Sequence, residues 1–193
     1  MTSASNLTSL AATAGEIHGA VVASIIRGSG QKPRSTPPPL EKPLAVLRET
    51  AKLSKEDFEK LSQIVTLAKN KPARLAETQL QLRQIDEALQ RKPASVHPLV
   101  LTISGIANDS ATTALSAQTS TNGNKATRQL KKEEQVVTTN VLLADVAGAV
   151  MGGYLAAKKG LSSYQIVVAA LVCGSVASSE VGSGEPFPNF QIE

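Results

Sequence analysis

The sequence has very few aromatic residues and only one cysteine. It contains no Trp, two Tyr and three Phe, so aromatic residues make up 3% of its 193 residues. Because aromatic side chains bury the largest area each, a core in this chain must be built from Leu, Val, Ile and Ala. That composition suits closely packed helices better than a β-sandwich. The single Cys173 excludes a disulfide within the chain and a zinc site made of several cysteines.

The motifs of common enzyme classes are also missing. The sequence has no G-x-S-x-G elbow, no phosphate-binding G-x-x-x-x-G-K-[ST] loop and no H-E-x-x-H pair. His18 and His97 are the only histidines, and neither has further ligands at metal-binding spacing. We therefore expect a non-enzymatic protein with no catalytic residue, no cofactor and no metal site, in which both histidines are structural or exposed.

The charge pattern gives little reason to expect an anionic partner. The net charge is +4 and the isoelectric point is about 9.3, but the basic residues are interleaved with acids. Nucleic acid is not expected, because almost no aromatic residue is available for stacking on bases, and no small-molecule substrate is evident. The first basic residue is Arg27, so the N-terminus lacks the positive region of a secretory signal. No cleavable signal peptide is expected, and the sequence leaves the location open between cytoplasmic and membrane-associated.

Composition and periodicity divide the chain into helical segments and linkers. Large apolar residues recur at steps of three and four through the N-terminus and again after the proline-rich region, which is typical of helices. The segments are an N-terminal amphipathic helix at 1–27, a Pro-rich linker at 28–43, a charged helical hairpin at 44–92, an apolar helical segment at 93–115, a flexible linker at 116–132, a small-residue-rich helical hairpin at 133–180 and a flexible tail at 181–193.

The charged hairpin has one thin apolar seam on each helix. Ser54 resembles a helix start, and Asn70 and Pro72 interrupt the run. We expect the two seams to face one another in an αα-hairpin. The seams are Phe58, Leu61, Val65 and Ala68 on the first helix and Leu75, Thr78, Leu82, Ile85 and Leu89 on the second.

The segment at 93–115 and the C-terminal tail are harder to assign. Leu99, Leu101 and Ile103 alternate as in a short strand, but the apolar run continues to Leu115, which favours a helix. In the tail, Phe187, Phe190 and Ile192 could dock onto the fold or onto a partner, and docking within the chain is the preferred interpretation.

The most informative feature is the helical hairpin at 133–180. Two apolar stretches flank the basic turn around Lys158 and Lys159, where Gly160 can end the first helix and Ser162 or Ser163 can begin the second. Each helix repeats small residues every fourth position, a glycine-zipper-like pattern that lets two backbones approach closely. The predicted helix-packing interface comprises Ala144, Gly148, Gly152, Ala156, Ala170, Gly174 and Ser178.

Two interpretations of this hairpin remain open. It can form the core of an all-α scaffold or interaction protein, in which the small residues mediate tight packing or self-assembly, with a protein partner or a second copy. Alternatively, it can associate with a membrane, although a spanning helix needs roughly 20 apolar residues and the second stretch is short. Asp145 in the first stretch also argues against a permanent span, because a carboxylate in the membrane is costly.

Overall fold

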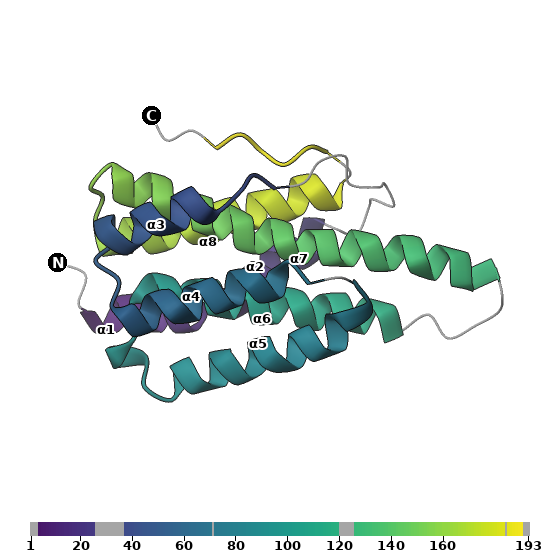
Figure 1. Ribbon diagram of the computed structural model, residues 1–193, viewed down its shortest axis with the longest axis horizontal. Coiled ribbons are helices and arrows are strands. Elements are labelled where there is room, and N and C mark those ends of the chain that lie inside the picture. The colour runs from purple at the N-terminus through teal and green to yellow at the C-terminus, as the bar shows by residue number, and fades with distance from the viewer. Residues whose placement is uncertain (1–3, 26–36, 71, 120–125, 184, 191–193) are drawn as a thin grey trace.

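Helix α6 runs through the middle of the structure, and most of the other helices contact it. The computed structural model describes residues 4–25, 37–70, 72–119, 126–183 and 185–190 (Figure 1). The α-helices are α1 (Ala4–Ala12), α2 (Ala14–Ile25), α3 (Glu41–Thr50), α4 (Lys55–Ala68), α5 (Leu75–Gln90), α6 (Pro98–Thr119), α7 (Ala126–Lys158) and α8 (Ser163–Gly182), with short 3-10 turns at Pro72–Arg74 and Pro93–Ser95.

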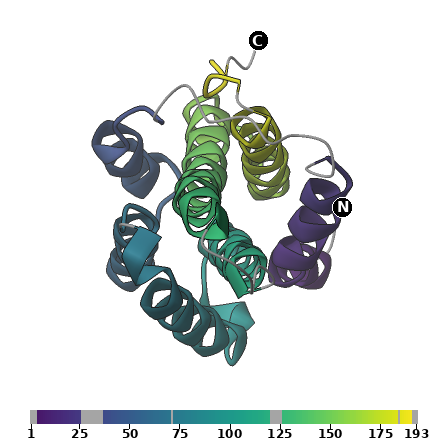
Figure 2. The ribbon, with the colours of Figure 1, turned by 90° about the vertical axis from the view of Figure 1, so that its right-hand side faces the viewer.

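The described residues form an all-α bundle with α6 and α7 at its centre. Figure 2 shows α3, α4 and α5 along one side of this pair, and α8 with α1 and α2 along the other side. Helix α8 packs along α7 as a closely spaced antiparallel partner, so the predicted C-terminal helical hairpin is confirmed. The region after Pro98 is helix α6 rather than a strand, as preferred from its continuous apolar run.

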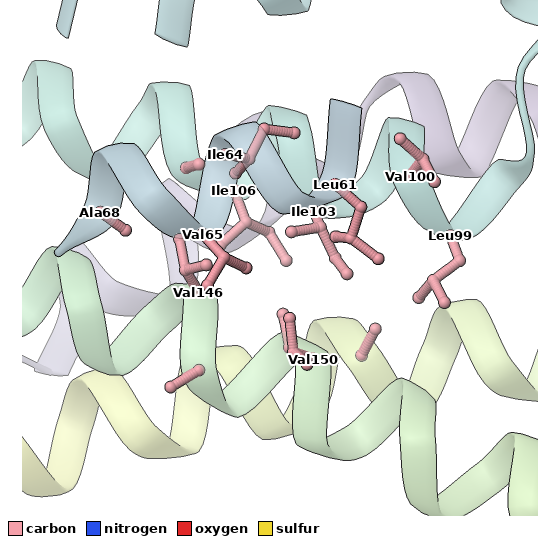
Figure 3. Packing of buried hydrophobic residues seen from close by; sticks show 14 of the residues in the cluster. Leu61, Ile64, Val65, Ala68, Leu99, Val100, Ile103, Ile106, Val146 and Val150 are labelled. Atoms are coloured by element: carbon pink, nitrogen blue, oxygen red, sulfur yellow. The ribbon is translucent and has the colours of Figure 1, made fainter. Parts of the chain in front are cut away.

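The core is built from aliphatic side chains where α4, α6 and α7 meet. Leu61 and Ile64 of α4 are fully buried, as is Ile106 of α6. Figure 3 shows Leu61 and Ile106 pointing toward Val146 and Val150 of α7. Full burial of one such side chain contributes about 1.5–3 kcal/mol. The aromatic-poor composition is therefore compensated by many interdigitating Leu, Ile and Val side chains.

Local sequence determines where several helices begin and end. Ser54 caps α4 by accepting a hydrogen bond from the Asp57 backbone N–H at 3.0 Å. Ser162 and Gln165 form a reciprocal capping box at the start of α8. Gly160 has a φ of 70° just after α7, the left-handed conformation that glycine adopts without steric cost. The predicted turn of the C-terminal hairpin is thus confirmed.

Three boundaries differ from the expectations. The N-terminal helix is divided at Thr13, whose hydroxyl donates to the Ser9 carbonyl at 3.1 Å, a local bond that bends helices. Much of the linker expected at 116–132 is helical, because α6 continues to Thr119 and α7 begins at Ala126. Pro43, assigned to the proline-rich linker, lies in the first turn of α3, where proline is tolerated.

The charged segment also packs differently from the expected hairpin. The predicted seam residues of α5 are all buried, but α5 packs mainly on α6 rather than on α4. Helix α4 contacts α6 and α7, and the additional helix α3 contacts α7. The two seams therefore face the central helices, because α6 and α7 offer more apolar area than either charged helix offers the other.

The tail contacts the hairpin, as preferred from sequence. Phe187 and Phe190 stack edge to face, with ring centroids 5.7 Å apart. Both rings pack against the small cluster formed by Ala144, Ala177 and Val181. Ile192 lies outside the described residues.

Candidate functional site

The small residues of α7 and α8 face each other inside the chain. A Cβ atom on Gly148 would overlap the backbone carbonyl oxygen of Cys173 and lie 2.7 Å from the Ala177 Cβ. A Cβ atom on Gly152 would overlap the carbonyl of Ala169. These contacts require glycine because the two backbones touch at both positions.

The seven residues predicted to form a packing interface are all buried, four on α7 and three on α8. Gly148 and Gly152 make the backbone contacts, whereas Gly174 faces the carbonyl oxygen of Asp145, 3.2 Å from its ideal Cβ position. Ala144 packs with Ala177 and Val181 beneath the tail. The glycine contacts at 148 and 152 are thus occupied by the chain's own helix, and another molecule would have to separate α7 from α8 to reach them.

A second close glycine contact joins α2 to α6. A Cβ atom on Gly15 would lie 2.6 Å from the carbonyl oxygen of Gly105, and one on Gly19 would lie 2.7 Å from the Asp109 carboxylate. Gly15 and Gly19 are four residues apart, so they lie on one side of α2. The same small-xxx-small spacing that predicted close packing in α7 therefore also occurs in α2, where the sequence analysis did not predict it.

This close approach places His18 of α2 in a buried ionic cluster. Its Nδ1 atom lies 3.5 Å from Asp109 Oδ2 of α6, and its Nε2 atom lies 3.6 Å from Asp145 Oδ1 of α7. The side chains of His18 and Asp145 are 1% and 0% exposed, respectively. Asp145 also accepts a short hydrogen bond from the Ser110 hydroxyl. One imidazole thereby connects three helices.

The two carboxylates determine the protonation state of His18. Burial alone would lower the pKa of His18, but the hydrogen bonds and charges of Asp109 and Asp145 outweigh it and raise the pKa to about 9. For Asp145, burial raises the pKa of the carboxyl, while its contacts with His18 and Ser178 act in the opposite direction. The cluster is best described as an imidazolium held between two carboxylates, with a net charge of about −1 when both are ionised.

The cluster is not arranged as a nucleophilic catalytic site. A serine–histidine mechanism needs one imidazole nitrogen facing the serine and free to accept its proton. Both nitrogens of His18 face carboxylates, and Ser110 is bonded to Asp145 instead. Among the residues that the structure describes, no group of three or more His, Cys, Asp or Glu could hold a metal ion. Burial also raises the pKa of the Cys173 thiol to about 11, which disfavours the reactive thiolate.

The clue to this cluster in the sequence was the isolation of its members. His18 and Asp145 are each flanked by apolar and small residues within an apolar helix. A buried polar or charged group is costly unless it is paired, so two isolated titratable residues in apolar helices point to each other. The pattern within each single helix predicted no partner for His18, and it indicated only that Asp145 argues against membrane insertion.

Helices α8 and α2 each leave two large apolar side chains exposed. On α8, Val172 and Val176 are 53% and 39% exposed, and on the neighbouring α2 Ile17 and Val21 are 36% and 40% exposed. Each pair is four residues apart and so lies on one side of its helix. We call these four residues the outer apolar face; the two helices that carry it are in contact (Figure 2).

Comparison of the chain with models of known families, with curated protein sequences and with solved structures gives no match. Function must therefore be argued from the packing, charges and surfaces of this chain alone.

Proposed function

We propose that the protein is a non-enzymatic helical interaction protein that self-associates through the outer apolar face. The observation that carries the proposal is the exposure of Val172 and Val176 on a helix whose opposite side is already buried against α7. A helix that is apolar on all sides is normally covered on all sides. The tight α7–α8 seam holds α8 in place, and its uncovered valines are then available to a second copy.

The scarcity of charged residues around this face favours an apolar partner surface. Helix α8 contains one charged residue, Glu180, and no Lys or Arg. Helix α2 contains only Glu16 and the buried His18 as charged or titratable groups. A second copy supplies a surface of the same composition, and a two-fold dimer brings the same patch of both subunits together. The interaction is expected to weaken little with added salt, because burial of apolar area drives it.

The double substitution Val172→Glu with Val176→Glu tests the proposal. Light scattering coupled to size-exclusion chromatography should show a concentration-dependent oligomer for the wild type and a monomer of 20.1 kDa for the variant. Burial of two carboxylates in an apolar interface is strongly unfavourable. Circular dichroism should be unchanged, because both valines are already exposed.

Leu80→Glu on α5 is the matched control. Leu80 is 44% exposed, like the valines, but it lies on the charged side of the bundle. It should leave the oligomer intact. A wild-type protein that stays monomeric at all concentrations, or a Leu80→Glu variant that dissociates equally, would contradict the assignment of the interface.

Membrane association is the second candidate, and the apolar length of two helices supports it. The windows Asn140–Lys158 and Ser163–Gly182 are long and apolar enough to cross a bilayer, with 67% and 50% of their residues buried inside the fold. Shallow contact through the outer apolar face needs no unfolding, whereas spanning would require α7 to leave the core. Flotation with liposomes tests this candidate: wild type should float and the Val172→Glu, Val176→Glu variant should not, while flotation of neither leaves self-association as the function supported.

A further inference from the structure

Helix α2 is docked on the bundle mainly through small residues and one titratable side chain. Of residues 14–21, only Ala14, Gly15 and His18 are buried. The two large apolar side chains of this stretch belong to the outer apolar face and are exposed. Glycine and alanine bury little apolar area, so docking gives this stretch little hydrophobic stabilisation. The ionic contacts of His18 therefore carry much of its attachment.

His18 joins α2 to two other helices, and it needs its proton to do so. Its two ring nitrogens lie 3.5 Å from an oxygen of Asp109 on α6 and 3.6 Å from an oxygen of Asp145 on α7. The imidazolium has an N–H on each nitrogen, whereas the neutral ring has only one. Loss of the proton therefore leaves one carboxylate without a donor and a cluster of negative charge inside the fold, which is strongly unfavourable.

The other groups around His18 do not replace its positive charge. Helix α1 has no charged residue, and the only charged residue of α8 is Glu180. Glu16 on α2 itself is exposed. The polar groups that the neighbouring helices bring to the cluster are carboxylates and hydroxyls: Asp109 and Ser110 of α6, Asp145 of α7 and Ser178 of α8.

Solvent reaches one side of this cluster. The side chain of Asp109 is 30% exposed, whereas that of Asp145 is 0% exposed. Asp109 and Glu16 line the same cavity of about 460 Å³ beside α2. Protons can therefore exchange with His18 by way of Asp109 while the core stays folded.

We propose that His18 is a proton-dependent latch that holds α2 on the bundle and thereby regulates self-association. The inference rests on the proposed function, because Ile17 and Val21 of α2 form half of the outer apolar face. Undocking of α2 separates them from Val172 and Val176 of α8. The pKa of His18 is raised to about 9 in the fold, so the latch is closed at neutral pH and opens as the pH rises through 9.

Solvent access to alanine methyl groups tests the latch in the wild-type protein. A soluble gadolinium chelate broadens the nuclear magnetic resonance signals of methyl groups that it can approach. The buried Ala14 methyl group of α2 should be protected at about pH 7 and broadened at about pH 10, while the buried Ala147 of α7 stays protected. The Val172→Glu, Val176→Glu variant should behave alike, because docking of α2 needs no second copy. Broadening of neither signal, or of both together, overturns the latch.

Light scattering over the same pH range tests the regulation of self-association. The dissociation constant of the wild-type oligomer should rise at least about tenfold between about pH 7 and about pH 10. His18→Gln should self-associate weakly at both pH values. His97→Gln is the matched control and should keep the wild-type pH dependence, because the pKa of His97 is lowered and its ring is already neutral in this range.

The two measurements separate failure of the latch from failure of the proposed function. An oligomer whose dissociation constant is independent of pH while the Ala14 signal broadens overturns the regulatory role. A pH dependence that persists in His18→Gln overturns it as well. A wild type that is monomeric at every pH contradicts the proposed self-association, and with it the regulatory role, while the methyl signals still decide whether His18 holds α2.

Discussion

The two sides of the bundle are stabilised in different ways. Helices α3, α4 and α5 carry many charged residues on their solvent faces and bury seams of large aliphatic side chains. Helices α1, α2 and α8 have almost no charge and rely on glycine and alanine contacts that bring backbones together. The charged side can adjust by side-chain movement, whereas the charge-poor side is fixed by backbone contacts. A substitution that adds a few atoms should therefore destabilise the fold more on the charge-poor side than on the charged side.

The pKa values of the two histidines do not follow the overall charge of the side on which each histidine lies. His97 lies on the charged side, where burial lowers its pKa despite the attraction of Asp57. His18 lies on the charge-poor side, yet Asp109 and Asp145 raise its pKa to about 9. The charge of the immediate neighbours, rather than the overall charge of a region, thus decides the protonation state of a buried group.

Adding a side chain to the α7–α8 seam should have the largest effect. Gly148→Leu places atoms where the Cys173 carbonyl already lies, so the helices must separate. We expect loss of cooperative thermal unfolding, measured by circular dichroism. On the charged side, Leu82→Ala should cost about 2–5 kcal/mol and leave the transition cooperative. If Gly148→Leu unfolds like the wild type, the claim that backbone contact stabilises this side is wrong.

Removing His18 should have the next largest effect and should depend on pH. His18→Gln leaves the buried Asp145 and the partly exposed Asp109 without their cation, which costs about 3–5 kcal/mol near neutral pH. The pKa of His18 is raised from 6.5 to about 9 on folding, so its stabilisation is fully present below pH 6.5 and is lost as the pH rises through 9. This shift corresponds to about 3 kcal/mol.

Urea unfolding at several pH values measures this dependence. The difference in unfolding free energy between wild type and His18→Gln should shrink between pH 6.5 and 9. His97→Gln is the control from the charged side, and it should not reproduce that loss at alkaline pH, because the pKa of His97 is lowered instead. A constant difference across the range would mean that His18 is neutral in the fold.

The smallest expected effect is the difference in pKa between the two imidazole rings, which can be measured directly. In a nuclear magnetic resonance titration, the signals of His97 should shift below pH 6.5 and those of His18 near pH 9. His97→Gln and His18→Gln assign the two sets of signals. If both rings titrate near the ordinary histidine pKa of 6.5, the proposed difference between His18 and His97 is wrong, whatever the stability measurements give.

Periodicity made much of the fold predictable. The buried seam of α5, the Ser54 cap and the turn at Gly160 each depend on residues within about one helical turn of one another. The arrangement of the charged helices was not predictable in this way. Whether the apolar seam of α5 packs on α4 or on α6 depends on the apolar area that every helix of the bundle offers. The ionic cluster was equally hidden, since His18, Asp109 and Asp145 belong to three helices far apart in sequence.

The sequence alone determined that the chain is helical, that small residues recur every fourth position in its last two helices and where those helices turn, because short-range geometry governs all three. Only the tertiary structure decided that the glycine seam is closed within the chain, that His18 meets Asp109 and Asp145, and that valines of α8 stay exposed. Those outcomes require helices distant in sequence to lie side by side, and a buried charge acquires its partner only through that assembly.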